Sequence, residues 1–197
     1  MRKTKTLKYI AKVGVLSAVA AILMLFEIPL WFAPSFYELD LSELPILIGG
    51  FALGPMAAVL MELVKNLLNL LMNGTNTAFV GEFANFVTGC AFVLPATLIY
   101  KYHKTRKGAI ISLGVGALSL VAVGAAINYF VLIPTFSSFY GLPIDAIVAM
   151  GTKVNGAITS LPTLIVFAVM PFNLLKAVVC SLLTMLLYKR LSKILHI

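Results

Sequence analysis

Long apolar stretches dominate the chain and decide what it can fold into. Three of them (Tyr9–Leu30, Leu44–Met72 and Thr77–Tyr100) precede residue 101, and two more (Ala109–Ile133 and Pro162–Leu187) follow it. A run of about 20 apolar residues is long enough to cross a bilayer as a helix. Because only 11% of the residues are charged, they cannot cover a water-facing surface, which excludes a soluble enzyme and a disordered chain. We therefore expect an all-α polytopic membrane protein in which residues 1–197 form a single domain in the lipid bilayer.

The basic residues predict the topology of this domain. They gather in the first twelve residues, in 101–107 and in 189–193, and such clusters collect on the cytoplasmic side of a membrane. The net charge of +8 therefore reflects membrane topology, and no nucleic-acid partner is expected. Between clusters on one side the number of crossings is even, so the overlong stretch from Leu44 to Met72 must divide at Gly54-Pro55. The prediction is six transmembrane helices with both termini cytoplasmic, over residues 9–30, 44–53, 55–72, 77–100, 109–133 and 162–187.

Two long connections stand apart from the hydrophobic background. Trp31–Glu43 mixes aromatic and acidic residues, and Pro134–Leu161 is too polar for a crossing. Both fall on the outer face in the predicted topology, which suggests the capture of a molecule from outside. The aromatic residues Trp31, Phe32, Phe36 and Tyr37 are interpreted either as an interfacial belt or as a lid over a flat ligand.

Polar residues within the apolar stretches are costly in a membrane and are therefore functional candidates. Asn128 lies in the 109–133 helix, while Asn173 and Lys176 lie three residues apart on one face of the 162–187 helix. Together they offer amide and ammonium donors to a flat, carbonyl-rich ligand edge. The alternative is that both amides bond to neighbouring backbone and that Lys176 snorkels or pairs with an acid such as Glu82.

Two further pairs of polar residues occur on the helices before residue 101. Glu62 and Lys65 are three residues apart and are expected to form a structural ion pair. Glu82 and Asn85 share a face at the start of the 77–100 helix, where contact with a ligand and anchoring of a loop are both open.

Catalytic and metal-binding motifs are missing from the sequence. It contains no HExxH, nucleophile elbow or GxxxxGK[ST] phosphate loop, and Cys90 and Cys180 are expected as separate thiols. We predict no catalytic residue, no metal and no cofactor, so that ATP-driven transport would need a partner. The first helix carries small-xxx-small pairs that suit close packing against a partner helix or within the same bundle; these residues are Gly14, Ser17, Ala18 and Ala21.

Four segments of the sequence resemble a known family. They read YELDLSELPILIGGFALGP, KNLLNLLMNGT, VGEFANFVTGC and PFNLLK, and they are similar to the substrate-binding S components of energy-coupling factor (ECF) transporters, most of all to the riboflavin-specific members. The resemblance extends over nearly the whole chain. It implies a vitamin-binding subunit of a prokaryotic plasma membrane that docks, through its first helix and neighbouring helices, onto a transmembrane coupling protein (the T component) and two ATPase subunits.

The resemblance also implies a flavin site on matching residues. Asn128, Asn173 and Lys176 would meet the polar edge of the isoalloxazine ring. The ribityl side would be surrounded and capped by a second group, which comprises Asp40, Leu41, Ser42, Glu43, Glu82 and Asn85. Riboflavin would be the transported ligand and not a cofactor, and ATP hydrolysed by the partner subunits would drive its delivery inward.

Three other functions stay open at this stage. The nearest is an S component for another vitamin or for FMN, whose phosphate would need an outer basic residue such as Lys153. The second is a membrane enzyme without a recognisable motif, and the third is a purely structural membrane partner.

Overall fold

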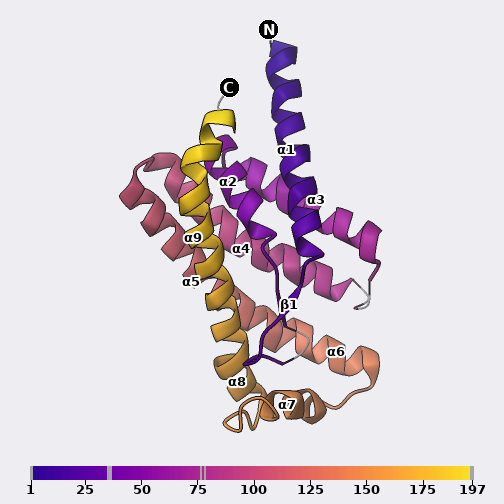
Figure 1. The fold of residues 1–197 in the computed structure, drawn as a ribbon. Helices are drawn as coiled ribbons and strands as arrows, with labels where there is room; N and C mark the ends of the chain where they lie inside the picture. The colour runs from indigo at the N-terminus through magenta and orange to yellow at the C-terminus, as the bar shows by residue number, and fades with distance from the viewer. Residues whose placement is uncertain (1, 35–36, 76, 78, 196–197) are drawn as a thin grey trace.

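The chain folds almost entirely into helices, and a short two-stranded ribbon joins the first two of them (Figure 1). The computed structural model describes residues 2–34, 37–75, 77 and 79–195, so Phe36 of the predicted aromatic group lies outside the described residues. In order the elements are α1 (Arg2–Met24), β1 (Ile28–Pro29), β2 (Glu38–Leu39), α2 (Glu43–Leu53), α3 (Pro55–Asn73), α4 (Val80–Tyr102), α5 (Arg106–Ile127), the π-helical turn η1 (Asn128–Leu132), α6 (Ile133–Tyr140), α7 (Ile144–Thr152), α8 (Leu161–Leu164), the π-helical turn η2 (Ile165–Val169) and α9 (Met170–Leu195).

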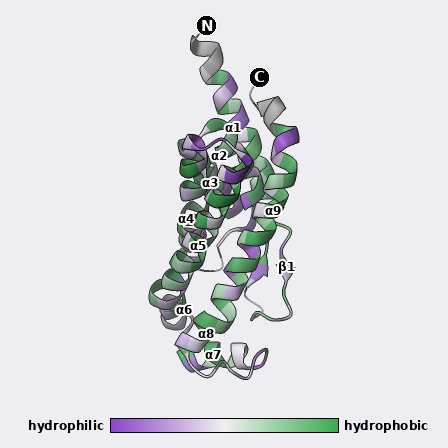
Figure 2. Cartoon of the chain, turned by 90° about the vertical axis from the view of Figure 1, so that its left-hand side faces the viewer, coloured by the Kyte–Doolittle hydropathy of each residue, from purple (hydrophilic) through white to green (hydrophobic). Residues whose placement is uncertain are grey.

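Within the described residues, five helical segments are long and apolar enough to cross a membrane. They span Thr6–Met24, Pro55–Asn73, Val80–Tyr102, Arg106–Tyr140 and Leu161–Leu191, while the apolar α2 has only 11 residues. Hydrophobic residues cover the shafts of these helices in Figure 2. The outward faces expose large apolar side chains, as lipid contact requires, for example Leu71, Leu118 and Leu186. The fold is therefore that of an all-α, multi-pass membrane protein.

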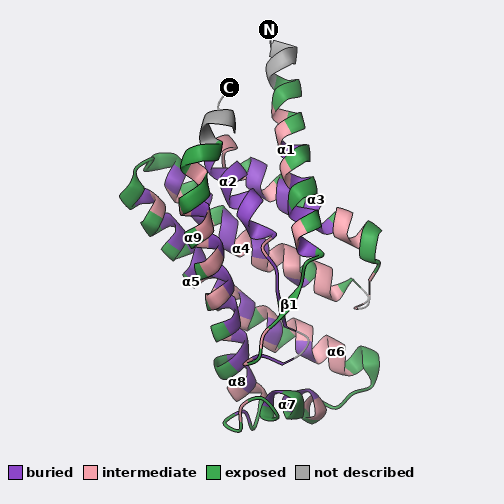
Figure 3. Cartoon of the chain, in the orientation of Figure 1, coloured by how far each residue is buried: buried purple, intermediate pink, exposed green. Residues whose placement is uncertain are grey.

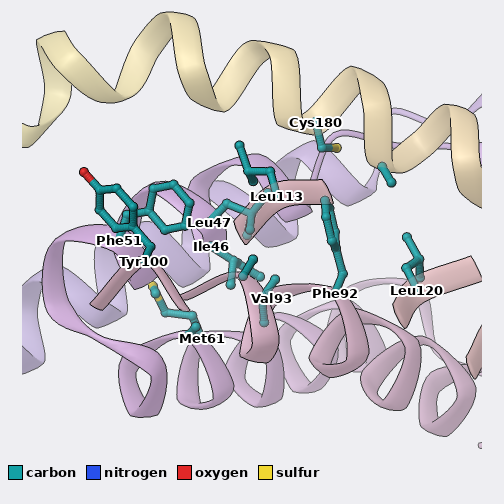
Figure 4. Packing of buried hydrophobic residues seen from close by; sticks show 14 of the residues in the cluster. Ile46, Leu47, Phe51, Met61, Phe92, Val93, Tyr100, Leu113, Leu120 and Cys180 are labelled. Atoms are coloured by element: carbon teal, nitrogen blue, oxygen red, sulfur yellow. The ribbon is translucent and has the colours of Figure 1, made fainter. Parts of the chain in front are cut away.

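The short helix α2 is the centre of the bundle. It contacts α1, α3, α4 and α9, and nine of its residues are buried (Figure 3). The break predicted at Gly54-Pro55 is confirmed, since Gly54 has a φ of 103° and Pro55 occupies the first turn of α3. Around α2 lies a group of buried residues that we call the helical core; it includes Ile46, Leu47, Phe51, Met61, Phe92, Val93, Leu113 and Leu120 (Figure 4).

The first helix is shorter than expected at its far end. It stops at Met24 instead of Leu30, and the chain turns at Leu25 and enters strand β1. Pro29 lacks a backbone N–H and disfavours helical geometry in the residue before it, so Ile28 and Pro29 adopt extended backbone. They pair antiparallel with β2, with Ile28 opposite Leu39 and Pro29 opposite Glu38.

The connection from Pro134 to Leu161 is more helical than its polarity suggested. The helical path of α5 continues through η1 into α6 as far as Tyr140, and α7 follows after a turn. Pro134 lies in the first turn after η1, and the wider π-helical turn accommodates a residue that has no N–H for the preceding turn. The last helical path is also longer than expected, since it runs from Leu161 to Leu195.

Both termini lie at one end of the bundle, and α6, α7 and α8 lie at the other (Figure 1). A second group of buried residues fills that far end. We call it the loop-end cluster; it includes Tyr37, Leu39, Ile133, Ile147, Val148, Ile158, Leu164 and Phe172. The β ribbon crosses between the two groups and brings its acidic residues to the space that separates them.

Candidate functional site

A cavity of about 220 Å³ lies between the helical core and the loop-end cluster. Leu120 of the helical core and Tyr37 and Phe172 of the loop-end cluster form part of its wall. Its polar lining comes from the β ribbon, α2, α4, η1 and α9, in the form of Glu27, Glu38, Asp40, Glu43, Asn85, Thr88, Asn128, Asn173 and Lys176. The cavity thus combines aromatic and aliphatic walls with a small set of converging polar groups, as small-molecule sites do.

Six of the nine residues predicted to contact substrate line this cavity, namely Asp40, Glu43, Asn85, Asn128, Asn173 and Lys176. The other three lie beside it. Leu41 packs against the helical core, and Ser42 is fully buried behind the cavity wall. Glu82 accepts a hydrogen bond from Thr77 Oγ1 at 2.8 Å, which agrees with the loop-anchoring interpretation.

Asn128 and Asn173 are both anchored to their own helices. Asn128 Nδ2 donates to Gly124 O at 2.8 Å, and Asn173 Nδ2 donates to Val169 O at 3.0 Å. Tyr37 Oη donates to Asn128 Oδ1 at 2.6 Å. The predicted backbone bonding of the amides is therefore confirmed, yet each amide group keeps a second N–H for another acceptor. Both side chains are held in fixed orientations at the cavity wall.

Lys176 forms a buried ion pair with Asp40 across 136 residues of sequence. Lys176 Nζ lies 2.8 Å from Asp40 Oδ2, so its partner is Asp40 and not Glu82. The two side chains are 11% and 8% exposed. Burial by itself would raise the pKa of Asp40, but the nearby ammonium groups of Lys176 and Lys65 outweigh it and lower the pKa to about 2. Asp40 is consequently ionised, and it fixes the Lys176 ammonium at the cavity.

A second cluster of charges lies behind the cavity on α3. The predicted pair of Glu62 and Lys65 is confirmed, with Lys65 Nζ 2.8 Å from Glu62 Oε2. Lys65 also lies 2.8 Å from Glu43 Oε1, which sequence spacing could not indicate because the two residues are 22 positions apart. Glu43 lines the cavity, so it connects this charge cluster to the site.

Two acidic residues at the cavity, Glu27 and Glu38, were not identified as site residues from the sequence. The register of the β ribbon brings them together, because Pro29 pairs with Glu38. Partial desolvation at the cavity, a hydrogen bond to Glu38 and the charges of Glu38 and Asp40 raise the pKa of Glu27 to about 7. The only sequence signal was their acidic character, within the apolar stretch Tyr9–Leu30 for Glu27 and within the connection Trp31–Glu43 for Glu38.

We expect Glu27 to make stability depend on pH near neutrality. Between its ordinary pKa of 4.5 and about 7, folded Glu27 holds a proton that the unfolded chain releases. The stabilisation is complete below that window and disappears as the pH rises through about 7. Melting temperatures of the detergent-purified protein should therefore fall from about pH 5 to about pH 7, and Glu27→Gln should flatten this decline. An unchanged pH profile in the variant would contradict this assignment.

The aromatic residues near the cavity separate into two groups. Trp31 is 89% exposed and meets Phe32 edge-on at 5.6 Å, an arrangement that fits an interfacial belt. Tyr37 is buried at the cavity wall, 5.3 Å from the ring of Phe172. Phe172 lay inside the apolar PFNLLK segment, where nothing distinguished it from a core residue.

The small residues of α1 also separate into two groups. Ser17 and Ala21 are buried inside the bundle, and Ser17 Oγ donates to Val13 O at 2.8 Å. Gly14 and Ala18 are exposed, and a β-carbon at Gly14 would meet nothing within 4 Å. Burial of Ser17 and Ala21 agrees with the alternative of packing within the same bundle, whereas Gly14 and Ala18, at the exposed edge of this helix face, remain accessible to a partner helix.

The described part of the chain offers few residues for metal binding or redox chemistry. No group of three or more His, Cys, Asp or Glu side chains that could hold a metal ion occurs in the described part of the chain. Cys90 and Cys180 are unpaired thiols.

Comparison with known proteins identifies the family. Residues 8–188 match the family described as ECF transporter, substrate-specific component. The riboflavin transporter RibU of Staphylococcus aureus (strain TCH60) is 36% identical over 188 residues, which cover 95% of this chain and 92% of that protein. The riboflavin transporter FmnP of Bacillus subtilis (strain 168) is 28% identical over 186 residues, covering 94% and 92% of the two chains.

A solved structure is similar as well. It is described as the S component of a bacterial ECF transporter, is 34% identical, covers 96% of this chain and 98% of its own, and has a TM-score of 0.74. The similarity makes the chain a transporter subunit and not an enzyme. The match across nearly the whole chain shows that it belongs to the family of substrate-specific (S) components of ECF transporters.

Proposed function

We propose that this S component binds riboflavin in the cavity between the helical core and the loop-end cluster. The carrying observation is that polar residues predicted for a flavin converge on one cavity, in a chain that is similar along its length to riboflavin transporters. Asn128, Asn173 and Lys176 would bind the carbonyl and ring-nitrogen edge of the isoalloxazine system. Asp40, Glu43 and Asn85 would bind hydroxyl groups of the ribityl chain, with Leu41, Ser42 and Glu82 supporting them from outside the cavity.

The residues suit a flat and uncharged ligand. Lys176 and the second N–H of each asparagine amide can donate to carbonyl oxygens, whereas carboxylates accept from hydroxyl groups. Tyr37, Phe172 and Leu120 supply apolar wall for the ring system. FMN fits this lining less well because its phosphate would face Glu27, Glu38, Asp40 and Glu43, and Lys153 does not line the cavity.

In the cell, we place the chain in a prokaryotic plasma membrane as six membrane-embedded helices, α2 included, with both termini cytoplasmic. The shared end of the two termini and the basic residues near them support this orientation. The cavity would then collect riboflavin from outside. A T component would dock on the exposed face of α1 at Gly14 and Ala18, and two ATPase subunits would supply the energy to deliver the ligand inward.

The direct test is a titration of the ligand-free, detergent-purified chain with riboflavin, monitored by flavin fluorescence. We expect saturable quenching at one flavin per chain, because the electron-rich ring of Tyr37 in the cavity wall can donate an electron to the excited flavin. Parallel titrations with FMN and with other vitamins serve as comparisons. Absence of quenching by riboflavin, or tighter binding of another compound, would overturn the proposed substrate while leaving the family unchanged.

A further inference from the structure

A continuous chain of polar contacts runs from α9 to α3 behind the cavity. It starts at Lys176, whose ammonium binds Asp40 Oδ2, and Asp40 Oδ1 accepts the backbone N–H of Ser42 at 2.8 Å. Ser42 Oγ then accepts from Lys65 Nζ at 3.3 Å. The loop of residues 40–43 is thus held from both sides by two lysines on different helices.

Lys65 is the largest fully buried side chain in the described part of the protein. It does not line the cavity. The Lys65 ammonium has three oxygen atoms around it, two as hydrogen-bond acceptors and one as an ion-pair partner. Lys65 Nζ donates to Ser42 Oγ at 3.3 Å and to Glu43 Oε1 at 2.8 Å, and it forms an ion pair with Glu62 Oε2 at 2.8 Å without hydrogen-bond geometry. The Lys65 ammonium is therefore held by two hydrogen bonds to the 40–43 loop and by the charge of its helix neighbour.

The position of Glu62 shows how close this cluster lies to the site. Gly89 lines the cavity, and a β-carbon added to it would lie 2.5 Å from Glu62 Oε2. Glu43 and Glu62 both lie 2.8 Å from Lys65 Nζ, and the side chain of Glu62 lies against the cavity wall at Gly89. If Lys65 were removed, the two buried acidic side chains would lose the cation between them, and Glu43 would no longer be held in place.

We propose that Lys65 is a positioning residue of the ligand site: without touching the ligand, it fixes the carboxylate of Glu43 in the arrangement that binds it. The inference rests on the proposed riboflavin site. It assigns Lys65 a role in ligand affinity, which a purely structural ion pair would not have. Lys65 acts through Glu43, so its effect on binding must depend on whether Glu43 is present.

A double-mutant cycle tests this dependence. Riboflavin dissociation constants are measured for the unaltered chain, Lys65→Met, Glu43→Gln and the double variant. We expect Lys65→Met to weaken binding by roughly tenfold or more, the range of one charge-assisted hydrogen bond. In the Glu43→Gln background the same change should cost no more than about twofold, within the error of additivity for independent sites.

A matched control separates positioning from general destabilisation. Thr184 is fully buried on α9, does not line the cavity, and donates to Cys180 O at 2.7 Å. Thr184→Val should lower the melting temperature and leave the dissociation constant unchanged. If Lys65→Met behaves like this control, or weakens binding by the same factor in both backgrounds, Lys65 is only structural and the inference is overturned.

Two outcomes need separate treatment. If Lys65→Met fails to fold, the riboflavin affinity of Glu43→Gln is compared with that of the double variant, in which both opposite charges are removed. A tenfold weaker affinity in the double variant than in Glu43→Gln, about 1.4 kcal/mol, would refute the inference. If the unaltered chain does not bind riboflavin, the proposed function itself fails. Riboflavin binding that is intact in the unaltered chain and equal in Lys65→Met overturns the role of Lys65 alone.

Discussion

Replacing Lys176 with Met is expected to weaken riboflavin binding by roughly 100-fold, the upper range for one hydrogen bond to a charged group. Lys176 lines the cavity, and its ammonium is fixed 2.8 Å from Asp40 Oδ2. Methionine keeps the apolar stem but removes the donors. It also leaves Asp40 buried without its partner, which costs about 3–5 kcal/mol of stability when one member of a buried pair is removed. Fluorescence titration and thermal melting of the purified variant measure the two effects separately.

Removing both charges distinguishes ligand contact from structural pairing. The double variant with Asp40→Asn and Lys176→Met should regain much of its melting temperature, because no uncompensated carboxylate remains. Its riboflavin affinity should stay low, because the donor is still missing, and Asp40→Asn alone provides the reference. If the double variant binds riboflavin as tightly as Asp40→Asn does, Lys176 serves only to neutralise Asp40 and does not contact the ligand.

The membrane helices were predictable from sequence because hydrophobicity and chain length are local properties. The division at Gly54-Pro55 followed from bilayer thickness and from the constraints on proline, and the structure has it at those residues. Helix ends were harder to predict. The strand at Ile28 and Pro29 exists because β2 lies opposite, and that pairing is a long-range contact that no local pattern contains.

The site was predictable where polar residues interrupt apolar helices. Asn128, Asn173 and Lys176 were visible because a membrane makes such residues costly, and all three line the cavity. Their partners were not visible. Asp40 meets Lys176 across 136 positions, and Lys65 meets Glu43 across 22, so only the packing of α2 against α3 and α9 brings these charges together.

Replacing Ala18 with Trp is expected to abolish riboflavin uptake and leave riboflavin binding unchanged. Ala18 is exposed on α1 one turn after Gly14, and together they leave a smooth face on which a partner helix can approach closely. An indole would hold the helices apart without reaching the cavity, which Ala18 does not line. Uptake by cells that produce the chain with a T component and ATPases should fall by roughly tenfold or more, the equivalent of about 1.4 kcal/mol of docking energy.

The control for this variant places the same bulk on another exposed face. Leu118 lies on α5 and is 69% exposed, so Leu118→Trp adds an indole to a lipid-facing surface away from α1. Uptake should persist in that variant. We expect the purified Ala18→Trp protein to bind riboflavin. Its loss of uptake would then be assigned to docking and not to folding. Normal uptake by Ala18→Trp would exclude this face of α1 as the docking surface, since a helix packed closely on Gly14 and Ala18 could not accommodate the larger side chain.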